Sequence, residues 1–236
     1  MRRLMCLFLC LVAVPASARQ VSVRTWTDEQ GVRWTETTTV EVVDEESAPG
    51  SDRLVPLSGA SSPVSGIAHF GPFVVIDATH AALIAETDGR SPADFRAMLA
   101  AFPGIAVLQM VDCPGTVDDT ANLALGRLIR ARGIATEVPE GGSVRSGAVE
   151  LFLAGAVRHA APDAEFAVHA WQDDDGRQPG DFAASDPVNA AYLRYYRDMG
   201  LAPQRAAAFY ALTNSVPNEQ VLWLHTADIA QYVTLN

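Results

Sequence analysis

GGSVRSGA, residues 141–148, is the stretch that decides the fold. It is a glycine-rich turn that leads directly into the apolar run Val149–Gly155. A serine between such a turn and the first turn of a helix has an exposed hydroxyl, and Gly147 after it leaves a main-chain N–H free to face a ligand. The stretch therefore presents Ser146 as a candidate nucleophile. A serine in this place is also typical of a helix cap, and that interpretation stays open.

Strands and helices alternate around this turn. A near-continuous apolar strand is expected at Ile105–Val111, followed by a proline–glycine turn and a helix with apolar residues at helical spacing. Further strands are expected at Ile134–Val138 and at Glu165–Trp171, which contains His169. This order predicts an α/β domain with a mostly parallel sheet, whose ligands bind at the carboxyl ends of the strands. The glycine turns and His169 are then expected to meet at one end of the sheet.

The chain begins with the features of a secretory signal peptide. Arg2 and Arg3 precede a short apolar run, and Ala16–Ala18 supplies small residues at the cleavage spacing. The apolar run is well short of the ~20 residues that a membrane-spanning helix needs. We expect removal of residues 1–18 and a periplasmic or secreted protein that has no membrane contact afterwards.

Composition divides the rest of the chain into three parts. Residues 19–43 alternate polar and apolar side chains around Asp28–Gly31, a pattern typical of a short β-hairpin. Residues 44–66 are rich in Asp, Glu, Ser, Pro and Gly, which predicts a flexible linker. The α/β domain is expected at 67–236.

Charge and cysteine content exclude several classes of function. The formal net charge is −11, and an acidic surface repels phosphate backbones, so we expect no nucleic-acid partner. Cys113 is expected to be a buried, inert thiol rather than a nucleophile. The histidines show no metal-ligand spacing, and Asp173–Asp175 is interpreted as a solvated turn rather than a calcium site. We therefore expect no metal and no cofactor.

Four short motifs follow one another in an order that resembles a known family. They are Pro114-Gly115, Leu125–Arg130, Ser146–Ala148 with Phe152–Gly155, and Phe166–His169. Together they are similar to the motifs of the Clp-type serine peptidases and their exported relatives within the crotonase-like fold. The resemblance implies repeated ββα units with a mostly parallel sheet, a peptide or acyl substrate, and a homo-oligomer.

The resemblance also implies roles for single residues. Ser146 matches the nucleophile, His169 the general base, and the main-chain N–H groups around Gly115 and Gly147 the oxyanion hole. The chemistry agrees, because an alcohol needs a neighbouring imidazole to remove its proton and a tetrahedral oxyanion needs preorganised N–H donors. The chain has no lysine, so a Ser-Lys mechanism is excluded.

The residue that orients His169 is expected late in the chain. Glu219 is the predicted acid, and Asp198 and Asp228 are its alternatives. A carboxylate in this role fixes the tautomer of the imidazole and stabilises the imidazolium.

Two residues beside the motifs are predicted to contact substrate. Thr116 stands where the family usually has a second glycine, and a β-branched residue resists the positive φ that glycine supplies. Arg145, next to the candidate nucleophile, is expected either to bind a substrate carboxylate through its forked donors or to pair with an acid such as Glu150.

The sequence as a whole predicts an exported, ATP-independent serine hydrolase of peptidase type that works through an acyl-enzyme. Two other functions remain open. One is a binding or scaffold protein that keeps the fold without catalysis, and the other is a hydrolase of small esters, which uses the same serine chemistry.

Overall fold

The structure is a computed structural model, and it describes residues 19–27, 33–41, 53–55 and 64–236. Contacts divide the chain into two units, residues 1–49 and residues 50–236. The predicted signal peptide and the turn of the predicted hairpin lie outside the described residues. Each unit is described by itself.

The first unit contains one pair of antiparallel strands. They are β1 (Arg19–Thr27) and β2 (Arg33–Glu41). The register pairs Arg19 with Glu41 and Trp26 with Trp34. Threonine, valine and tryptophan favour extended backbone, which agrees with the alternating pattern of this segment.

The larger sheet of the second unit has six strands. In spatial order these are β12 (Arg158–Ala160), β10 (Ala135–Val138), β7 (Val107–Met110), β6 (His80–Leu83), β5 (Phe73–Val75) and β4 (Ala68–Phe70). The strands from β6 to β12 run parallel, and β4, β5 and β6 form an antiparallel meander at one edge.

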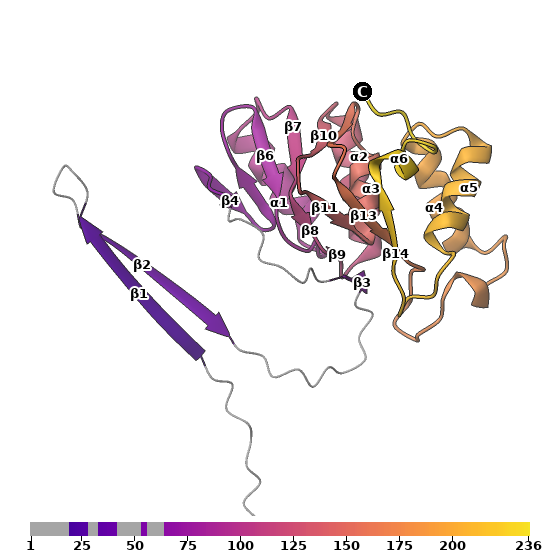
Figure 1. Cartoon of the computed structure of the whole chain (residues 1–236), viewed down its shortest axis with the longest axis horizontal. Coiled ribbons are helices and arrows are strands. Elements are labelled where there is room, and N and C mark those ends of the chain that lie inside the picture. The colour runs from indigo at the N-terminus through magenta and orange to yellow at the C-terminus, as the bar shows by residue number, and fades with distance from the viewer. Residues whose placement is uncertain (1–18, 28–32, 42–52, 56–63) are drawn as a thin grey trace, which may run out of the picture. The chain divides into compact units, whose positions relative to one another are not determined.

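The second sheet has four strands and carries the candidate nucleophile. In spatial order they are β14 (Leu222–His225), β13 (Glu165–Val168), β11 (Ser143–Arg145) and β8 (Asp112–Cys113). Strand β11 runs parallel to both of its neighbours, and β14 is antiparallel to β13. A separate two-stranded pair joins β3 (Arg53–Leu54) to β9 (Gly115–Thr116) in antiparallel fashion. Figure 1 shows the order of these elements.

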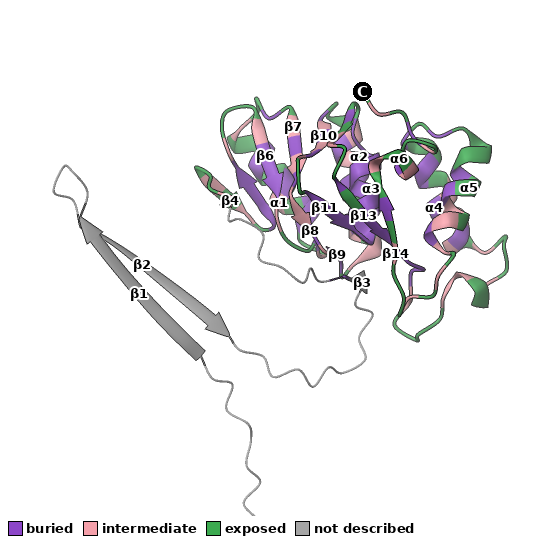
Figure 2. Ribbon diagram, in the orientation of Figure 1, coloured by how far each residue is buried: buried purple, intermediate pink, exposed green. Residues whose placement is uncertain are grey.

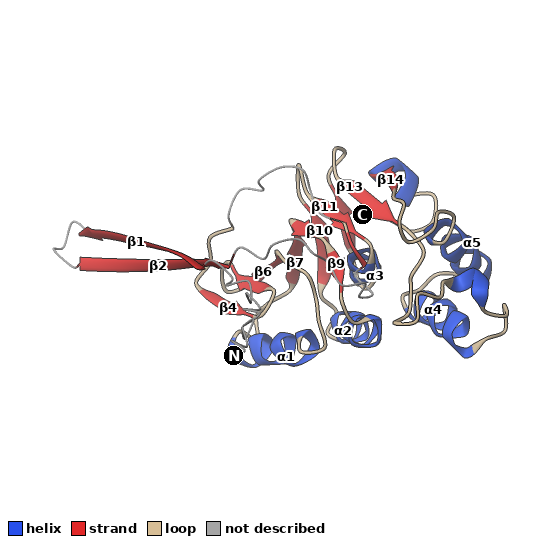
Figure 3. Ribbon diagram, turned by 90° about the horizontal axis from the view of Figure 1, so that it is seen from below, coloured by secondary structure: helices blue, strands red, loops and turns tan. Residues whose placement is uncertain are grey.

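Helices flank the strands. They are α1 (Ser91–Ala101), α2 (Asp119–Ala131), α3 (Gly147–Leu153), α4 (Pro187–Asp198), α5 (Pro203–Thr213) and α6 (Thr226–Ile229), with a short 3₁₀ turn at Pro179–Asp181. Figure 3 shows α1 and α2 side by side on one face of the strands and α4 with α5 beyond β14. The described helices include none that is long and apolar enough to cross a bilayer.

Local sequence explains where the helices begin and end. The Asp118 side chain accepts a hydrogen bond of 2.9 Å from the Ala121 N–H, which caps the start of α2. Gly133 follows that helix with a φ of 67°, a left-handed conformation that glycine adopts without a Cβ clash. Prolines in the first turns of α1, α4 and α5 cost no hydrogen bond, since their N–H groups would have no partner there.

The core lies between the strands and the helices, with buried residues from α1 to α6, and Figure 2 colours the buried residues purple. Phe152 and Phe166 pack with their ring centroids 5.1 Å apart, directly behind the four-stranded sheet. Cys113 is wholly buried there, and its thiol donates to the Leu83 carbonyl. The predicted burial of this thiol is thus confirmed, and burial also raises its pKa far above the usual value for cysteine.

The α/β class and the mostly parallel strands are confirmed, and three local details differ from expectation. The strand that was expected to contain His169 ends at Val168, so the histidine lies just past the strand. Helix α3 (Gly147–Leu153) begins directly after Ser146, and so earlier than the apolar run Val149–Gly155 suggested. Arg53 and Leu54, inside the predicted linker, pair with β9, and the Val55 N–H bonds to the Pro114 carbonyl just before it.

Candidate active site

Ser146 stands on a sharp strand–turn–helix junction. Strand β11 ends at Arg145 and α3 begins at Gly147, so Ser146 alone makes the turn. Its φ is 51° and its ψ is −128°, and it is the one residue other than glycine with a positive φ in the described part of the chain. Its N–H donates to the Ala167 carbonyl at 2.7 Å, which ties the turn to β13. Such a conformation costs about 1–3 kcal/mol and is concentrated at functional sites.

The Ser146 hydroxyl, which its place on the turn predicted to be exposed, is instead buried, and it has no hydrogen-bond partner among the described residues. The residue is 4% exposed. A buried polar group left unpaired costs about 1–3 kcal/mol, so an arrangement that keeps it calls for a physical reason. A nucleophile that bonds only to its substrate and its base during the reaction is such a reason.

His169 lies at the carboxyl end of the neighbouring strand. The register pairs Arg145 of β11 with Ala167 of β13, so the residues that follow these two positions leave the sheet side by side. His169 is 3% exposed. Its Nδ1 lies 3.0 Å from the Ala170 carbonyl oxygen. A proton on Nδ1 donated to that carbonyl leaves Nε2 as an acceptor, the tautomer that a general base needs.

Asn218, which the sequence reasoning missed, contacts the same edge of the imidazole. It lies between α5 and β14, and its Nδ2 is 3.2 Å from His169 Nδ1 and 2.9 Å from the Ala170 carbonyl oxygen. Its own N–H donates to Gln178 Oε1 at 3.0 Å, which fixes the loop. An asparagine in a loop carries no sequence signal of this role, apart from its place beside Glu219.

The predicted acids lie in other contacts. Glu219 is exposed, and its carboxylate accepts from Gln178 Nε2 at 3.4 Å. Asp198 pairs with Arg127 at 3.1 Å, and Asp228 accepts from the His225 N–H at 2.9 Å. The contacts of these three carboxylates are thus with groups other than the imidazole, whereas Asn218 contacts it directly.

The two glycine turns touch each other. A Cβ placed on Gly147 would lie 2.4 Å from Cγ2 of Thr116, so only glycine fits there. Gly147 is also the first residue of α3, where an N–H has no acceptor within the helix. Gly115 has a φ of 136°, which other residues rarely adopt. Thr116 is free of the positive φ that was expected to strain it, because Gly115 takes that conformation instead.

A buried polar network holds these turns in place. Asn122 Nδ2 donates to the Gly147 carbonyl at 2.6 Å, and Asn122 Oδ1 accepts from Thr87 Oγ1 at 2.9 Å. Thr87 also binds the other turn, because its N–H donates to the Gly115 carbonyl at 3.0 Å and its carbonyl accepts from Thr116 Oγ1 at 3.0 Å. Buried, satisfied networks of this kind rigidify a site. No motif in the sequence pointed to Thr87 or Asn122.

Arg145 turns away from Glu150. Its Nη2 pairs with Asp112 Oδ1 at 2.5 Å, and its Nε donates to the Val55 carbonyl at 2.5 Å. The side chain is almost wholly buried, and its Nη1 has no partner among the described residues. Glu150 instead accepts from the Tyr196 hydroxyl at 2.7 Å. The ion pair predicted for Arg145 therefore exists, with Asp112 as its acid.

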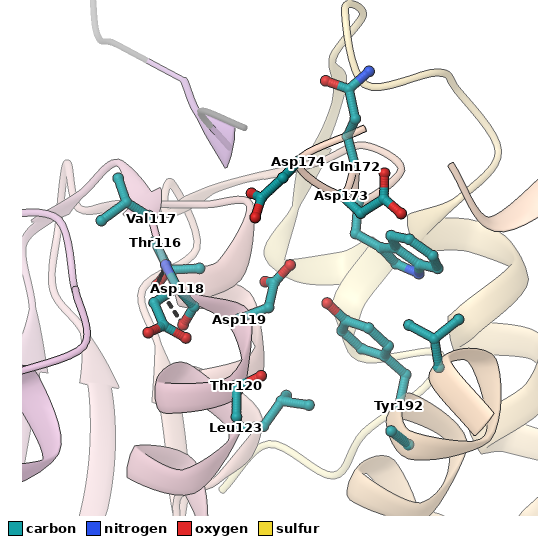
Figure 4. Close-up of a pocket in the computed structure, with 13 residues that line it drawn as sticks. Thr116, Val117, Asp118, Asp119, Thr120, Leu123, Gln172, Asp173, Asp174 and Tyr192 are labelled. Carbon is teal, nitrogen blue, oxygen red and sulfur yellow. Dashed lines mark hydrogen bonds between the residues drawn. The ribbon is translucent and has the colours of Figure 1, made fainter. Parts of the chain in front are cut away.

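A cavity of about 470 Å³ opens beside Thr116. Its walls come from the start of α2, from the loop after His169 and from α4, with Thr116, Asp119, Trp171, Asp174 and Tyr192 among the residues that line it. Figure 4 shows the Asp119 carboxylate and the Tyr192 hydroxyl pointing into this space and Asp174 reaching over it. The lining includes Thr116, which follows Gly115, and Trp171, which lies two residues after His169.

Comparisons with known proteins give similarities of fold. No family model matches the chain, and no curated protein matches it. Among solved structures, the chain is similar to the ClpP protease catalytic domain from Plasmodium falciparum, with a TM-score of 0.44 and 13% identity over 64% of this chain and 79% of that chain. It is also similar to a membrane-bound stomatin-specific protease solved in complex with a substrate peptide, with a TM-score of 0.41 and 14% identity over 65% of this chain and 72% of that chain.

Proposed function

We propose that this chain is a serine hydrolase of peptidase type, with Ser146 as nucleophile and His169 as general base. The observation that carries the proposal is the state of Ser146. Its backbone is held in a strained turn and its buried hydroxyl has no partner among the described residues, at the strand end next to the one that carries His169. A turn serine that only caps a helix would bond to the helix N–H groups, and Ser146 forms no such bond.

In the proposed mechanism, Ser146 Oγ attacks the carbonyl carbon of the substrate while His169 Nε2 takes the hydroxyl proton. The Nδ1 proton is donated to the Ala170 carbonyl, and Asn218 Nδ2 donates to the same carbonyl and so holds the acceptor in place. The imidazolium then gives its proton to the leaving amine, which leaves an acyl-enzyme. Water, deprotonated by the same imidazole, hydrolyses the ester and restores Ser146.

The oxyanion of each tetrahedral intermediate would bind the main-chain N–H groups of Gly147 and of the Gly115–Thr116 turn. The contact between Gly147 and Thr116 supports this, since it places the two turns within a single small site. The bonds from Asn122 and Thr87 preorganise the turns before substrate arrives. Preorganised donors of this kind account for a large part of the rate in acyl transfer.

The proposed substrates are peptides or already unfolded chains, and their side chains would enter the cavity beside Thr116. Export of the chain through its signal peptide is part of the proposal, as is independence of ATP, which is not supplied outside the cytoplasm. Self-assembly into a homo-oligomer is also part of it, and light scattering of the purified protein measures that directly.

Labelling with a fluorophosphonate probe tests the chemistry. The probe reacts covalently with activated serines, so the wild-type chain is expected to label and Ser146→Ala to lose all label. Ser143→Ala is the matched control, because Ser143 is buried on the same strand and its hydroxyl likewise lacks a partner among the described residues. Equal labelling of the Ser146→Ala protein and the wild type would contradict the proposal.

A scaffold protein without catalysis is the second candidate, and the burial of both Ser146 and His169 favours it. A scaffold is expected to take no label under any condition, including after displacement of residues 53–55 as described below. An esterase is separated by a panel of p-nitrophenyl esters and quenched peptides, since rapid ester turnover without peptide cleavage would remove the peptidase claim.

A further inference from the structure

Residues 53–55 lie in extended conformation against the proposed active site. We propose that this segment is a resident peptide ligand of the site: it occupies the edge of β9 and the Arg145 guanidinium in place of substrate and has to leave before substrate binds. The site thus binds extended main chain, and residues 53–55 of the same protein occupy it before substrate does. This inference rests on the proposed function for its inhibitory part only, since the binding site can be measured without catalysis.

The segment pairs with the two residues of β9, which belong to the turn that is proposed to bind the oxyanion. The register pairs Leu54 with Gly115 and Arg53 with Thr116, and the Val55 N–H donates to the Pro114 carbonyl at 3.2 Å. Hydrogen-bonded and non-bonded pairs alternate along antiparallel strands. Val55 and Pro114 form a hydrogen-bonded pair, so Leu54 and Gly115 form a non-bonded pair and Arg53 and Thr116 are again at a bonded position. The Thr116 N–H therefore faces the main chain of Arg53.

That amide belongs to the turn that is proposed to hold the oxyanion. The opposite edge of β9 is already used by Thr87, whose N–H donates to the Gly115 carbonyl and whose carbonyl accepts from the Val117 N–H. The edge of β9 that faces residues 53–55 is therefore the edge at which a substrate strand could bind. A substrate strand and residues 53–55 would compete for the same donors, as in peptide recognition by strand addition.

Arg145 provides a second, independent contact with the segment. Its Nε donates to the Val55 carbonyl, while Asp112 holds Nη2 and so fixes the plane of the guanidinium. Nη1 remains buried without a partner in the described part of the chain. A buried guanidinium N–H is costly to leave unpaired. The site therefore has a donor in excess of what residues 53–55 use, which points to a ligand richer in acceptors.

The segment is suited to bind and to be released. Val55 precedes Pro56, and the residue before a proline is restricted to extended backbone, so it costs little entropy to hold this segment as a strand. Pro56 has no N–H and cannot lengthen the ladder. Val55 is the anchor, since its side chain is only 7% exposed. The main-chain bonds of Val55 and its buried side chain make a contact that substrate can displace.

The test uses the full-length mature chain with Val55→Asp, which places a charge in the anchor position. Val157→Asp is the matched control, because Val157 is an exposed valine outside the site. Two quantities are measured for each protein: the rate of fluorophosphonate labelling, and the binding of a fluorescein-labelled peptide GSDRLVPL, residues 50–57, by anisotropy in a Ser146→Ala background. We expect Val55→Asp to bind the peptide and to label about tenfold faster than the wild type, since loss of one buried valine is worth about that factor.

The outcomes separate the two proposals. Peptide binding by Val55→Asp and not by the wild type or by Val157→Asp supports the resident ligand, and if no protein labels, the hydrolase proposal alone fails. A folded Val55→Asp protein that binds no peptide and labels at the wild-type rate overturns the inference. Far-UV circular dichroism checks the fold, and Val55→Gly, which removes the anchor without adding a charge, replaces Val55→Asp if that variant does not fold.

Discussion

The serine end and the histidine end of the candidate site are built differently. Ser146 is fixed by covalent neighbours: a strand held on both sides, a one-residue turn and a helix that starts at once. His169 lies just beyond a strand and takes its orientation from the carbonyl of Ala170 and from Asn218, which comes from a loop far along the chain. The nucleophile is therefore positioned by local backbone, whereas the base depends on a tertiary contact.

Replacing the base is expected to have the largest effect. His169→Gln keeps a polar side chain of similar length but cannot accept and return the serine proton. We expect the rate of fluorophosphonate labelling to fall by about 10⁴-fold or more, as when a triad member is lost. Labelling of His169→Gln at a rate near wild type would mean that the two ends are not coupled through this imidazole.

The serine end is tested at its glycine. A methyl group at Gly147 would lie 2.4 Å from Thr116 Cγ2, so Gly147→Ala has to push the two turns apart. Loss of an oxyanion-hole donor costs about 10²–10³ in rate, and we expect a fall of about 10² in kcat for a quenched peptide. Gly180→Ala is the control, because a Cβ there meets open space. Equal kcat values for the two variants would remove the oxyanion role.

The histidine end is tested by placing a carboxylate next to His169 in the variant Asn218→Asp. In Asn218→Asp the new carboxylate can accept the Nδ1 proton and stabilise the imidazolium. Exchange of a carboxylate for an amide costs about 10⁴ in the template triad, so part of that factor is expected to return, about tenfold in labelling rate. The pH at which labelling is half-maximal should rise as well, since a nearby negative charge raises the pKa of histidine. Asn214→Asp, four residues earlier at the end of α5, should do neither.

A smaller effect, on stability alone, is expected on the far side of α3. The Tyr196 hydroxyl donates to Glu150 Oε1 at 2.7 Å, and burial, with the Glu150 charge, raises the pKa of this tyrosine well above its usual value. Tyr196→Phe removes a buried hydrogen bond to a charged group and is expected to lower the free energy of unfolding by about 1–3 kcal/mol. Urea titration followed by tryptophan fluorescence measures it, with the half-buried Tyr232→Phe as control.

The smallest effect is expected in the six-stranded sheet, away from both ends of the site. Hydrogen bonds from the Thr79 N–H and from the His80 ring hold the pKa of Asp77 well below the usual value of an aspartate. A carboxyl with a depressed pKa stabilises the fold above its unfolded pKa, and that stability is lost as pH falls through the folded pKa. Thermal melts from about pH 5 to about pH 2 should therefore fall less steeply for Asp77→Asn than for the wild type. Parallel curves would show that these bonds contribute nothing.

The sequence predicted what local pattern determines. The apolar strands, the glycine turns and the helix starts follow from residue spacing, and so did the place of Ser146 on a turn into a helix. Asn218, Thr87 and Asn122 did not follow from it, because their contacts join residues far apart in the chain and a single polar side chain has no periodic pattern. The assignment of Glu219 came one residue from Asn218, since the motif fixes the loop but not which side chain of the loop faces the imidazole.

The predicted linker, residues 44–66, also shows that sequence pattern does not predict tertiary contacts. Its composition of Asp, Ser, Pro and Gly describes the average of residues 44–66, whereas Arg53 and Leu54, which pair with β9, and Val55, which bonds to Pro114, depart from that average. The one local signal of a strand here was Val55, an apolar residue that the following Pro56 restricts to extended backbone. Pairing with Gly115 and Thr116 depends on where β9 lies in the fold, which composition does not contain.

The burial of Cys113 has a practical consequence for watching residues 53–55 move. Cys6 and Cys10 lie in the predicted signal peptide, so a mature chain would carry one native thiol, and that thiol is wholly buried with its pKa raised. A cysteine introduced at Arg53 would then be the single thiol to react with a maleimide dye under native conditions. Its fluorescence would report the departure of the strand in real time without any native cysteine having to be removed.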